Sequence, residues 1–295
     1  MAVTNSIAPK SNTKPTFTAT ISSKGYQTLI ANTIKDPKRA NRFIASVTSA
    51  VTTNPLLSDC EASSIVSSAL LGESLELSPS PQLGQFYLVP YNDNKSGTKK
   101  AQFQLGVAGY KQLAMRSGQY LDIDAIEIRE GEYLGKDPNT GKPRFSFIED
   151  DDVREELPVI GYLAYFELLN GFKKSVYWSK TKIEKHADKY SKAFNLKTFK
   201  DIEAGKIPEK DMWKYSSPWY SSFNDMALKT VIKNLLSKWG ILSISMQTAI
   251  EEDSKADADL DSNIFTAETT EVKNKAVEDF FGGESEVVEA EVVEK

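Results

Sequence analysis

Apolar and polar residues alternate through the middle of the chain, which is the pattern of β-strands with one face in a core. Residues 84–92 and 100–107 are expected to form a hairpin, because a run of turn-forming residues separates them. The same alternation predicts a strand over 120–130. The turn-rich segment 134–145 leads into a further strand at 144–149. The middle of the chain is therefore predicted to be mainly antiparallel sheet.

A second hairpin is expected over residues 158–179, with its turn at Asn170-Gly171, a pair suited to a type I′ turn. The highly basic segment 179–194 is predicted to follow it as a helix. The last ordered element is expected to be a helix over about 219–239.

Helical periodicity also precedes the strands, over 24–35 and 38–53. Ser58 stands three residues before Glu61, the spacing of a capping box, and predicts the start of a third helix. A short helix is expected over 108–117, between the two hairpins. These elements predict an α+β fold, in which a central antiparallel sheet of hairpins is flanked by helices.

The charge of the chain is divided unevenly along its 295 residues, of which 40% are hydrophobic and 26% are charged. Residues 251–295 hold 15 Asp and Glu against 4 Lys, which leaves 32 Lys and Arg and 26 Asp and Glu in 1–250. Such an asymmetry is typical of proteins that meet nucleic acid or membranes. We expect a disordered segment over 1–22, a single domain over 23–250, and an acidic disordered or partner-docking tail over 251–295.

Several classes of protein are disfavoured by composition. The sequence contains no run of 18 apolar residues, so no transmembrane helix is expected, and residues 1–25 lack the apolar core of a secretory signal. The single Cys60 makes no intrachain disulfide, which suits a reducing cytoplasm. Together with the single His186 it leaves little for a zinc site. We expect a cytoplasmic protein with no membrane association, no resident metal and no catalytic residue.

The most informative stretch is KKAQFQLGVAGYKQLAMRSGQY, residues 99–120. Gly106 and Gly109 are spaced G-x-x-G, which matches neither a Walker A loop nor a dinucleotide fingerprint, so a nucleotide pocket is poorly supported. Bases, amides and an aromatic taken to be exposed suit a phosphodiester backbone, although a solvated sheet face and an ordinary helix are the alternative. The candidate DNA contacts are Lys99, Lys100, Gln102, Gln104, Tyr110, Lys111 and Arg116.

The helix expected over 219–239 has an apolar stripe and a polar ridge. The stripe contains Leu228, Val231, Ile232, Leu235, Leu236 and Trp239. The ridge contains Lys229, Thr230 and Lys233 and is placed to run along a DNA strand. A plain amphipathic helix with solubilising lysines is the alternative.

Residues 173–192 combine seven lysines with Tyr177, Trp178 and Tyr190. Basic residues among aromatic ones are typical of single-strand binding surfaces, where cations follow phosphates and rings stack on bases. Lys180, Lys182 and Lys185 are the candidates here. We interpret His186 as structural or as a minor contact.

Acidic residues offer a weak alternative. Asp122, Asp124 and Glu127 share one strand, and 149–152 is a run of four acids, so a metal-dependent nuclease is conceivable. The acidic run lies near Glu155 and Glu156, which is more typical of a solvated loop.

Four blocks together resemble the RecT family of phage single-strand annealing recombinases. In order, they are ALLGESLELSPSPQLGQFYLVPYN, QFQLGVAGYKQLAMRSGQ, YWSKTKIEK and WYSSFNDMALKTVIKNLL, within residues 25–250. Glu73 and Ser74 in the first block depart from the family's more usual uncharged residues.

This resemblance implies an ATP-independent protein, not an enzyme, that binds single-stranded DNA and anneals it to its complement to give a duplex. It implies that 23–250 is the DNA-binding, annealing and oligomerisation domain, assembled in rings or helical filaments. It also implies action with a partner exonuclease and a host single-strand binding protein. No cofactor is expected, and assistance by Mg²⁺ through screening is left open. The matching blocks imply that ten residues line a DNA groove or contact phosphates. They are Gln104, Tyr110, Lys111, Arg116, Lys180, Lys182, Lys185, Lys229, Thr230 and Lys233.

Besides the nuclease, a structural phage protein that assembles without DNA remains an alternative. The acidic tail is expected either to compete with DNA for the groove or to dock a partner.

Overall fold

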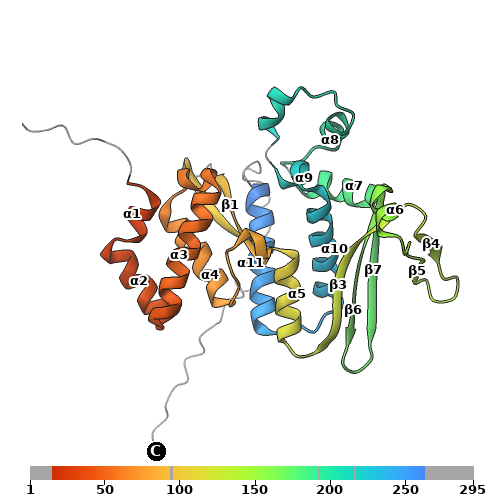
Figure 1. Cartoon of the computed structure of the whole chain (residues 1–295), viewed down its shortest axis with the longest axis horizontal. Coiled ribbons are helices and arrows are strands. Elements are labelled where there is room, and N and C mark those ends of the chain that lie inside the picture. The colour runs from red at the N-terminus through yellow and green to blue at the C-terminus, as the bar shows by residue number, and fades with distance from the viewer. Residues whose placement is uncertain (1–14, 94–95, 192, 216, 263–295) are drawn as a thin grey trace, which may run out of the picture.

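The N-terminal helices lie together at one end of the molecule (Figure 1). The protein is described by a computed structural model that covers residues 15–93, 96–191, 193–215 and 217–262. Asp36 caps the longest of these helices by accepting a hydrogen bond from the Lys38 amide, and Pro37 takes its first position. The elements are α1 (Phe17–Ile21), α2 (Lys24–Ile34), α3 (Pro37–Thr53), η1 (Pro55–Asp59) and α4 (Ala62–Ser74).

Two antiparallel sheets form the middle of the chain. The hairpin of β1 (Phe86–Asp93) and β2 (Thr98–Leu105) follows the short η2 (Pro81–Leu83) and packs on α4. The second sheet has the order β3-β6-β7, with strands β3 (Tyr120–Arg129), β6 (Val159–Leu168) and β7 (Lys173–Ser179). Both hairpins predicted from the sequence are therefore confirmed.

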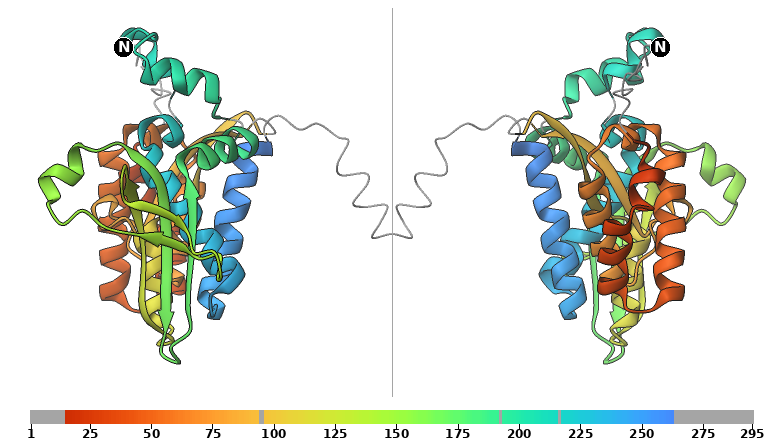
Figure 2. Two further views of the ribbon diagram at one scale, coloured as in Figure 1. Left: turned by 90° about the vertical axis from the view of Figure 1, so that its right-hand side faces the viewer. Right: turned by 90° about the vertical axis from the view of Figure 1, so that its left-hand side faces the viewer.

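A small arm crosses the outer face of the three-stranded sheet (Figure 2). It consists of β4 (Tyr133–Lys136) and β5 (Pro143–Phe145), which pair antiparallel. The Tyr133 ring stacks on Tyr177 of β7 with ring centroids 4.6 Å apart, and this contact holds the arm to the sheet. The helix α6 (Asp151–Glu156) connects the arm to β6.

Helices cover the inner face of the sheet. α10 (Phe223–Trp239) packs on β3, β6 and β7, and the Tyr162 hydroxyl of β6 donates a 2.7 Å hydrogen bond to Asn224. α5 (Val107–Arg116) packs on β3 and α10, and α11 (Ile244–Ser262) lies against β2 and α5. Buried side chains from the N-terminal helices, both sheets and these helices form one continuous core.

The remaining helices lie beyond β7. α7 (Lys180–Tyr190) begins at Ser179, whose side chain accepts from the Lys182 amide as a capping residue does. The segments that follow are α8 (Leu196–Glu203), η3 (Glu209–Lys214) and α9 (Pro218–Ser221). Among the described residues, no helix is both long enough and apolar enough to cross a membrane.

Four sequence predictions about local structure are corrected. Ser58 lies inside η1, so it does not cap α4, because Asn54 and Pro55 begin a 3₁₀ turn before it. The turn at Asn170-Gly171 is not type I′, which needs positive φ at both residues, because Gly171 alone takes one, at 81°. The strand expected over 144–149 is short and ends at Phe145.

The fourth correction concerns the predicted ends of the domain. Part of the segment expected to be disordered, 1–22, forms α1, and part of the expected tail, 251–295, belongs to α11, which follows the helix predicted to be the last ordered one. The rest of both predictions, over 1–14 and 263–295, lies outside the described residues.

Candidate nucleic-acid interface

The two glycines at the corner between β2 and α5 are close-packing positions. A Cβ atom on Gly106 would collide with the carbonyl oxygen of Gly84, and one on Gly109 with that of Gln85. The Gly106 amide donates to the Gln85 carbonyl at 2.8 Å. The protein's own backbone thus takes the space and the amide that a bound phosphate would need.

The lysines of the β1–β2 hairpin are paired with carboxylates. Lys99 Nζ lies 2.7 Å from Asp59 Oδ2, and Lys100 Nζ lies 2.6 Å from Asp93 Oδ2. In each case the hydrogen bond to the carboxylate is the main cause that raises the lysine pKa. Both lysines are partly exposed, and exposed pairs of this kind are weak enough to exchange for another anion.

The hairpin face and α5 are more covered than the sequence indicated. Gln102 is half-buried and Gln104 is 6% exposed. Tyr110 is fully buried, and its hydroxyl donates to Asp253 Oδ2 at 2.8 Å. The interpretation of Tyr110 as an exposed aromatic is therefore wrong, because α11 supplies a carboxylate that satisfies the hydroxyl inside the molecule.

The other two candidates on α5 remain at the surface. Lys111 Nζ lies 2.8 Å from Asp124 Oδ1 of β3. Arg116 bonds Glu76 at 3.1 Å and the Leu75 carbonyl at 2.8 Å, which ties α5 to the end of α4. Each cation is already neutralised locally and would have to exchange partners to meet a phosphate.

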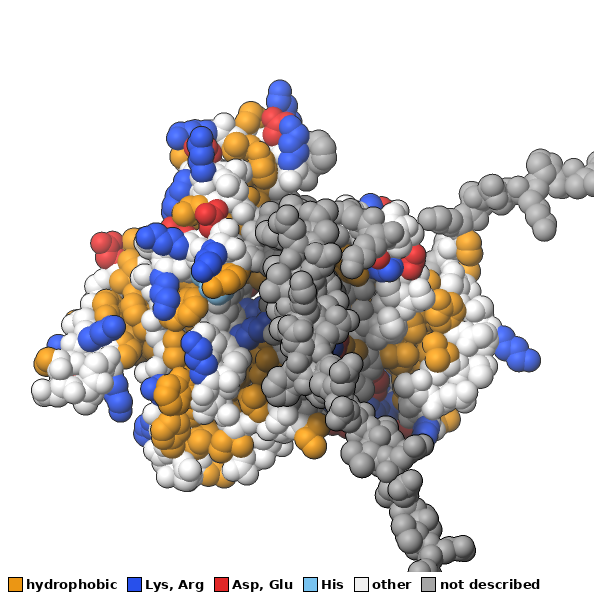
Figure 3. Space-filling view, turned by 180° about the vertical axis from the view of Figure 1, so that it is seen from behind, with side chains coloured by type: hydrophobic (Ala, Val, Ile, Leu, Met, Phe, Trp, Pro, Cys, Tyr) orange, Lys and Arg blue, Asp and Glu red, His pale blue; other side chains and the backbone are white. Residues whose placement is uncertain are grey.

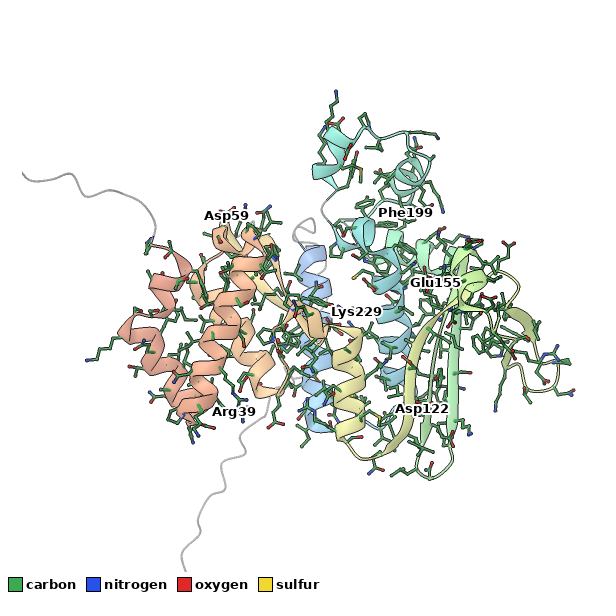
Figure 4. All side chains as sticks on the ribbon, in the orientation of Figure 1. Arg39, Asp59, Asp122, Glu155, Phe199 and Lys229 are labelled. Carbon is green, nitrogen blue, oxygen red and sulfur yellow. The ribbon has the colours of Figure 1, made fainter. Side chains whose placement is uncertain are left out.

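The polar ridge of α10 points largely inward. Lys229 and Lys233 lie 2.7 and 3.0 Å from the two carboxylate oxygens of Asp253, and Figure 4 shows Lys229 near the centre of the molecule. The side chain of Lys229 is 8% exposed, so its predicted place on an outer ridge is wrong. Burial raises the pKa of Asp253, but the two ammonium groups outweigh it and hold that pKa below its ordinary value. The Thr230 hydroxyl donates to the Met226 carbonyl.

A different group of lysines lies beside a row of aromatic rings on β7 and α7 and beside Trp239 at the end of α10. Trp178 and His186 have centroids 5.2 Å apart, and His186 and Tyr190 have centroids 4.6 Å apart. Lys182 Nζ lies 3.9 Å from the centre of the Trp178 ring. We call this the basic–aromatic face, which contains Trp178, His186, Tyr190, Trp239, Lys136, Lys174, Lys182, Lys185, Lys189 and Lys238.

Like charges from three elements meet on this face. Burial lowers the pKa of Lys182, and repulsion from Lys238 of α10 and Lys136 of β4 lowers it further. Within the described part of the chain, none of these three lysines has a carboxylate oxygen within 4.0 Å. A cluster of unneutralised cations favours an anionic ligand.

The basic–aromatic face is open to solvent. Figure 3 shows Lys and Arg side chains gathered around the chain's single histidine, with hydrophobic side chains between them. Tyr190 is 54% and Trp239 is 48% exposed, and Lys174 Nζ lies 3.9 Å from the centre of the Trp239 ring. Rings and cations of this kind are the parts of a surface that binds single-stranded nucleic acid.

The structure places the third group of sequence candidates here, and it adds residues that the sequence did not reveal. Lys182 and Lys185 belong to the face, whereas Lys180 lies 3.0 Å from Glu203 of α8. Lys136 was missed because its segment was interpreted as a turn. Lys238 was missed although it is next to Trp239 in the sequence. Lysine and tryptophan also occur together in β7, where they were used to predict a DNA-binding surface.

The acidic residues do not gather into a site. Asp122 and Asp124 share one face of β3 and Glu127 lies on the other, as their partners in β6 show. Asp122 and Glu155 lie at opposite ends of the sheet in Figure 4. Among the described residues, no three His, Cys, Asp or Glu side chains are grouped to hold a metal ion.

Comparison with known proteins identifies the family. The model of the RecT family matches residues 41–266. An uncharacterised Bacillus subtilis protein, YqaK, is 42% identical over 217 residues, which cover 73% of this chain and 65% of YqaK. Escherichia coli RecT is 28% identical over 240 residues, or 80% of each chain. The family match covers all of the basic–aromatic face and most of the described fold, and the chain belongs to the RecT family.

Proposed function

We propose that this protein binds single-stranded DNA on the basic–aromatic face and pairs complementary strands without ATP. The observation that supports this most is that Lys182 lies over the Trp178 ring within reach of the charges of Lys136 and Lys238, and that none of these three lysines has a carboxylate partner among the described residues. Such a cluster repels itself, and a polyanion relieves the repulsion. Family membership supports a role in recombination and annealing.

In this proposal the protein does no covalent chemistry. Lysines neutralise backbone phosphates, which lowers the repulsion between two DNA strands. Exposed rings such as Tyr190 and Trp239 contact bases by stacking, which every base permits. Base pairing between the strands then provides the driving force and the specificity.

Five sequence candidates that are paired with carboxylates are proposed as outer contacts of the same DNA. Lys99, Lys100, Lys111, Arg116 and Lys180 are each paired with a carboxylate, so each would exchange that carboxylate for a phosphate. Because DNA is long, neighbouring protomers would join their faces end to end in a head-to-tail contact, which makes rings or filaments. The exonuclease and single-strand binding protein implied as partners remain predictions.

The dependence of binding on salt tests this proposal. For a fluorescent single-stranded oligonucleotide, log K is expected to fall linearly with log salt, with a slope of about −0.7 per phosphate contact. The double variant Lys182→Ala/Lys238→Ala should bind more weakly and with a slope about 1.4 units shallower. The matched control, Lys24→Ala/Lys38→Ala, removes the same charge from α2 and α3 at the far end of the molecule (Figure 1).

Four outcomes would count against the proposal. Equal losses in the two double variants would show that net charge matters and the basic–aromatic face does not. An affinity that does not change with salt concentration would show that the protein does not bind DNA through its phosphates. Cleavage of the oligonucleotide, abolished by a chelator, would favour the nuclease instead, and oligomers whose size ignores DNA would favour a structural protein.

A further inference from the structure

One carboxylate at the centre of the molecule is surrounded by donors from three other elements. Asp253 of α11 is fully buried. Its Oδ1 accepts from the Leu105 amide at 3.0 Å and from Lys229 Nζ at 2.7 Å. Its Oδ2 accepts from the Tyr110 hydroxyl at 2.8 Å and from Lys233 Nζ at 3.0 Å. β2, α5 and α10 therefore form a cradle for two oxygens that share one negative charge.

The cradle has the donors of a phosphate site. A phosphodiester also presents two unesterified oxygens that share one negative charge, and backbone amides, hydroxyls and lysines are its usual partners in proteins. Tyr110, Lys229 and Lys233 are also among the residues that the sequence indicated as DNA contacts. Each of them donates a hydrogen bond to Asp253 of α11.

α11 is attached to the body by few side chains. Of its described residues, only Met246, Ala249 and Asp253 are buried, whereas the first residue, Ile244, is 84% exposed. α10, by contrast, buries seven side chains. An open cleft of about 530 Å³, lined by α4, the β1–β2 hairpin and α11, further reduces the contact of α11 with the body. Elements with little buried apolar surface are those that open locally without global unfolding.

α11 is rich in acidic residues and is therefore negatively charged, as DNA is. Residues 251–262 contain six Asp and Glu against one Lys. An acidic helix placed on lysines competes with any polyanion for the same cations. DNA offers many phosphates at once, so it has an advantage over a single short helix.

We propose that the Leu105 amide, Tyr110, Lys229 and Lys233 form a binding site for a DNA backbone phosphate, which Asp253 occupies in the DNA-free protein. Withdrawal of α11 exposes the site as the DNA strand enters. This inference rests on the proposed binding of single-stranded DNA. The inference adds a second set of protein contacts to the same DNA, and it makes Asp253 an internal competitor of DNA for these contacts.

Hydrogen exchange of the unaltered protein tests this directly. Amides of residues 244–262 are compared with and without a saturating single-stranded oligonucleotide. Faster exchange across α11 in the complex is expected, because the helix leaves the body. Unchanged or slower exchange in a complex whose formation is confirmed would overturn the inference while leaving DNA binding intact. If no complex forms, the proposed function fails together with this inference.

A pair of variants provides a second test. Asp253→Asn weakens the internal competitor, so single-stranded DNA should bind about tenfold tighter. Glu252→Gln removes the same charge from the next position, where the side chain is 34% exposed and paired with Lys255, and it is the matched control. The gain should disappear when Lys233→Ala is added to Asp253→Asn. A gain no larger than that of Glu252→Gln would contradict the competition, and if Asp253→Asn fails to fold, hydrogen exchange of the unaltered chain decides.

Discussion

Replacing the buried Glu132 with glutamine is expected to destabilise the protein and to loosen the β4–β5 arm. The side chain of Glu132 is fully buried at the start of this arm. Its Oε1 accepts from Arg154 Nε at 2.6 Å, and its Oε2 accepts from the Arg129 amide at 2.7 Å. One carboxylate therefore ties β3, the arm and α6 together, and the arm carries Lys136.

The magnitude follows from the loss of charge without loss of shape. Breaking a buried ion pair by removing one partner costs about 3–5 kcal/mol of unfolding free energy. Arg154 is 25% exposed and can turn partly to water, so the lower end, about 3 kcal/mol, applies here. For a domain of this size that loss corresponds to a fall in Tm of roughly 6–12 °C.

Urea and thermal unfolding followed by circular dichroism at pH 7 would measure this effect. Glu130→Gln is the matched control, because Glu130 is exposed two residues away and should change the unfolding free energy by less than about 0.5 kcal/mol. If the two variants unfold alike, then the Glu132 carboxylate does not hold the arm and the reasoning from its buried hydrogen bonds is wrong.

Other predictions concern pH, packing, stacking and thiol chemistry. Burial raises the pKa values of Glu132 and Glu203, but hydrogen bonds from basic partners outweigh it and hold both pKa values below their ordinary values. The contribution of the two carboxylates to stability is therefore complete above about pH 4.5 and is lost as pH falls through the lowered pKa values. The unfolding free energy, measured from pH 7 to pH 3, should decline below about pH 4.5. Gly109→Ala should cost about 2 kcal/mol or more, measured by urea unfolding, because its Cβ meets fixed backbone. Tyr190→Ala should weaken single-strand binding by about 1–3 kcal/mol in the same anisotropy assay, whereas unchanged affinity would remove this ring from the DNA contact. Burial raises the pKa of Cys60 to about 11, so Ellman's reagent should react with it slowly at pH 8 and much faster after denaturation.

Local periodicity was enough to predict most of the fold. Alternation of apolar and polar residues predicted β3, and runs of strand-forming residues on either side of turn-forming ones predicted the hairpins β1–β2 and β6–β7. Errors arose where neighbouring residues compete. Asn54 and Pro55 start a 3₁₀ turn ahead of the Ser58 cap, and α11 is held partly by charged contacts that a hydrophobic pattern does not report.

The site was less predictable because it depends on contacts between distant residues. Nothing near Tyr110 in the sequence indicates that Asp253, 143 residues later, will bury its hydroxyl. The basic–aromatic face was predicted where lysines and rings share one segment, as at Trp178 and Lys182. It was missed at Lys136 and Lys238, which only the packing of β4 and α10 brings to the same place.

The central claim is most directly tested by the rate at which two complementary dye-labelled oligonucleotides pair in the presence of protein and without ATP. The proposal predicts rapid, salt-sensitive pairing with the unaltered protein. It predicts slow pairing with Lys182→Ala/Lys238→Ala and near-normal pairing with Lys24→Ala/Lys38→Ala. Rapid pairing that survives the loss of Lys182 and Lys238 would contradict the claim that the basic–aromatic face carries the annealing activity.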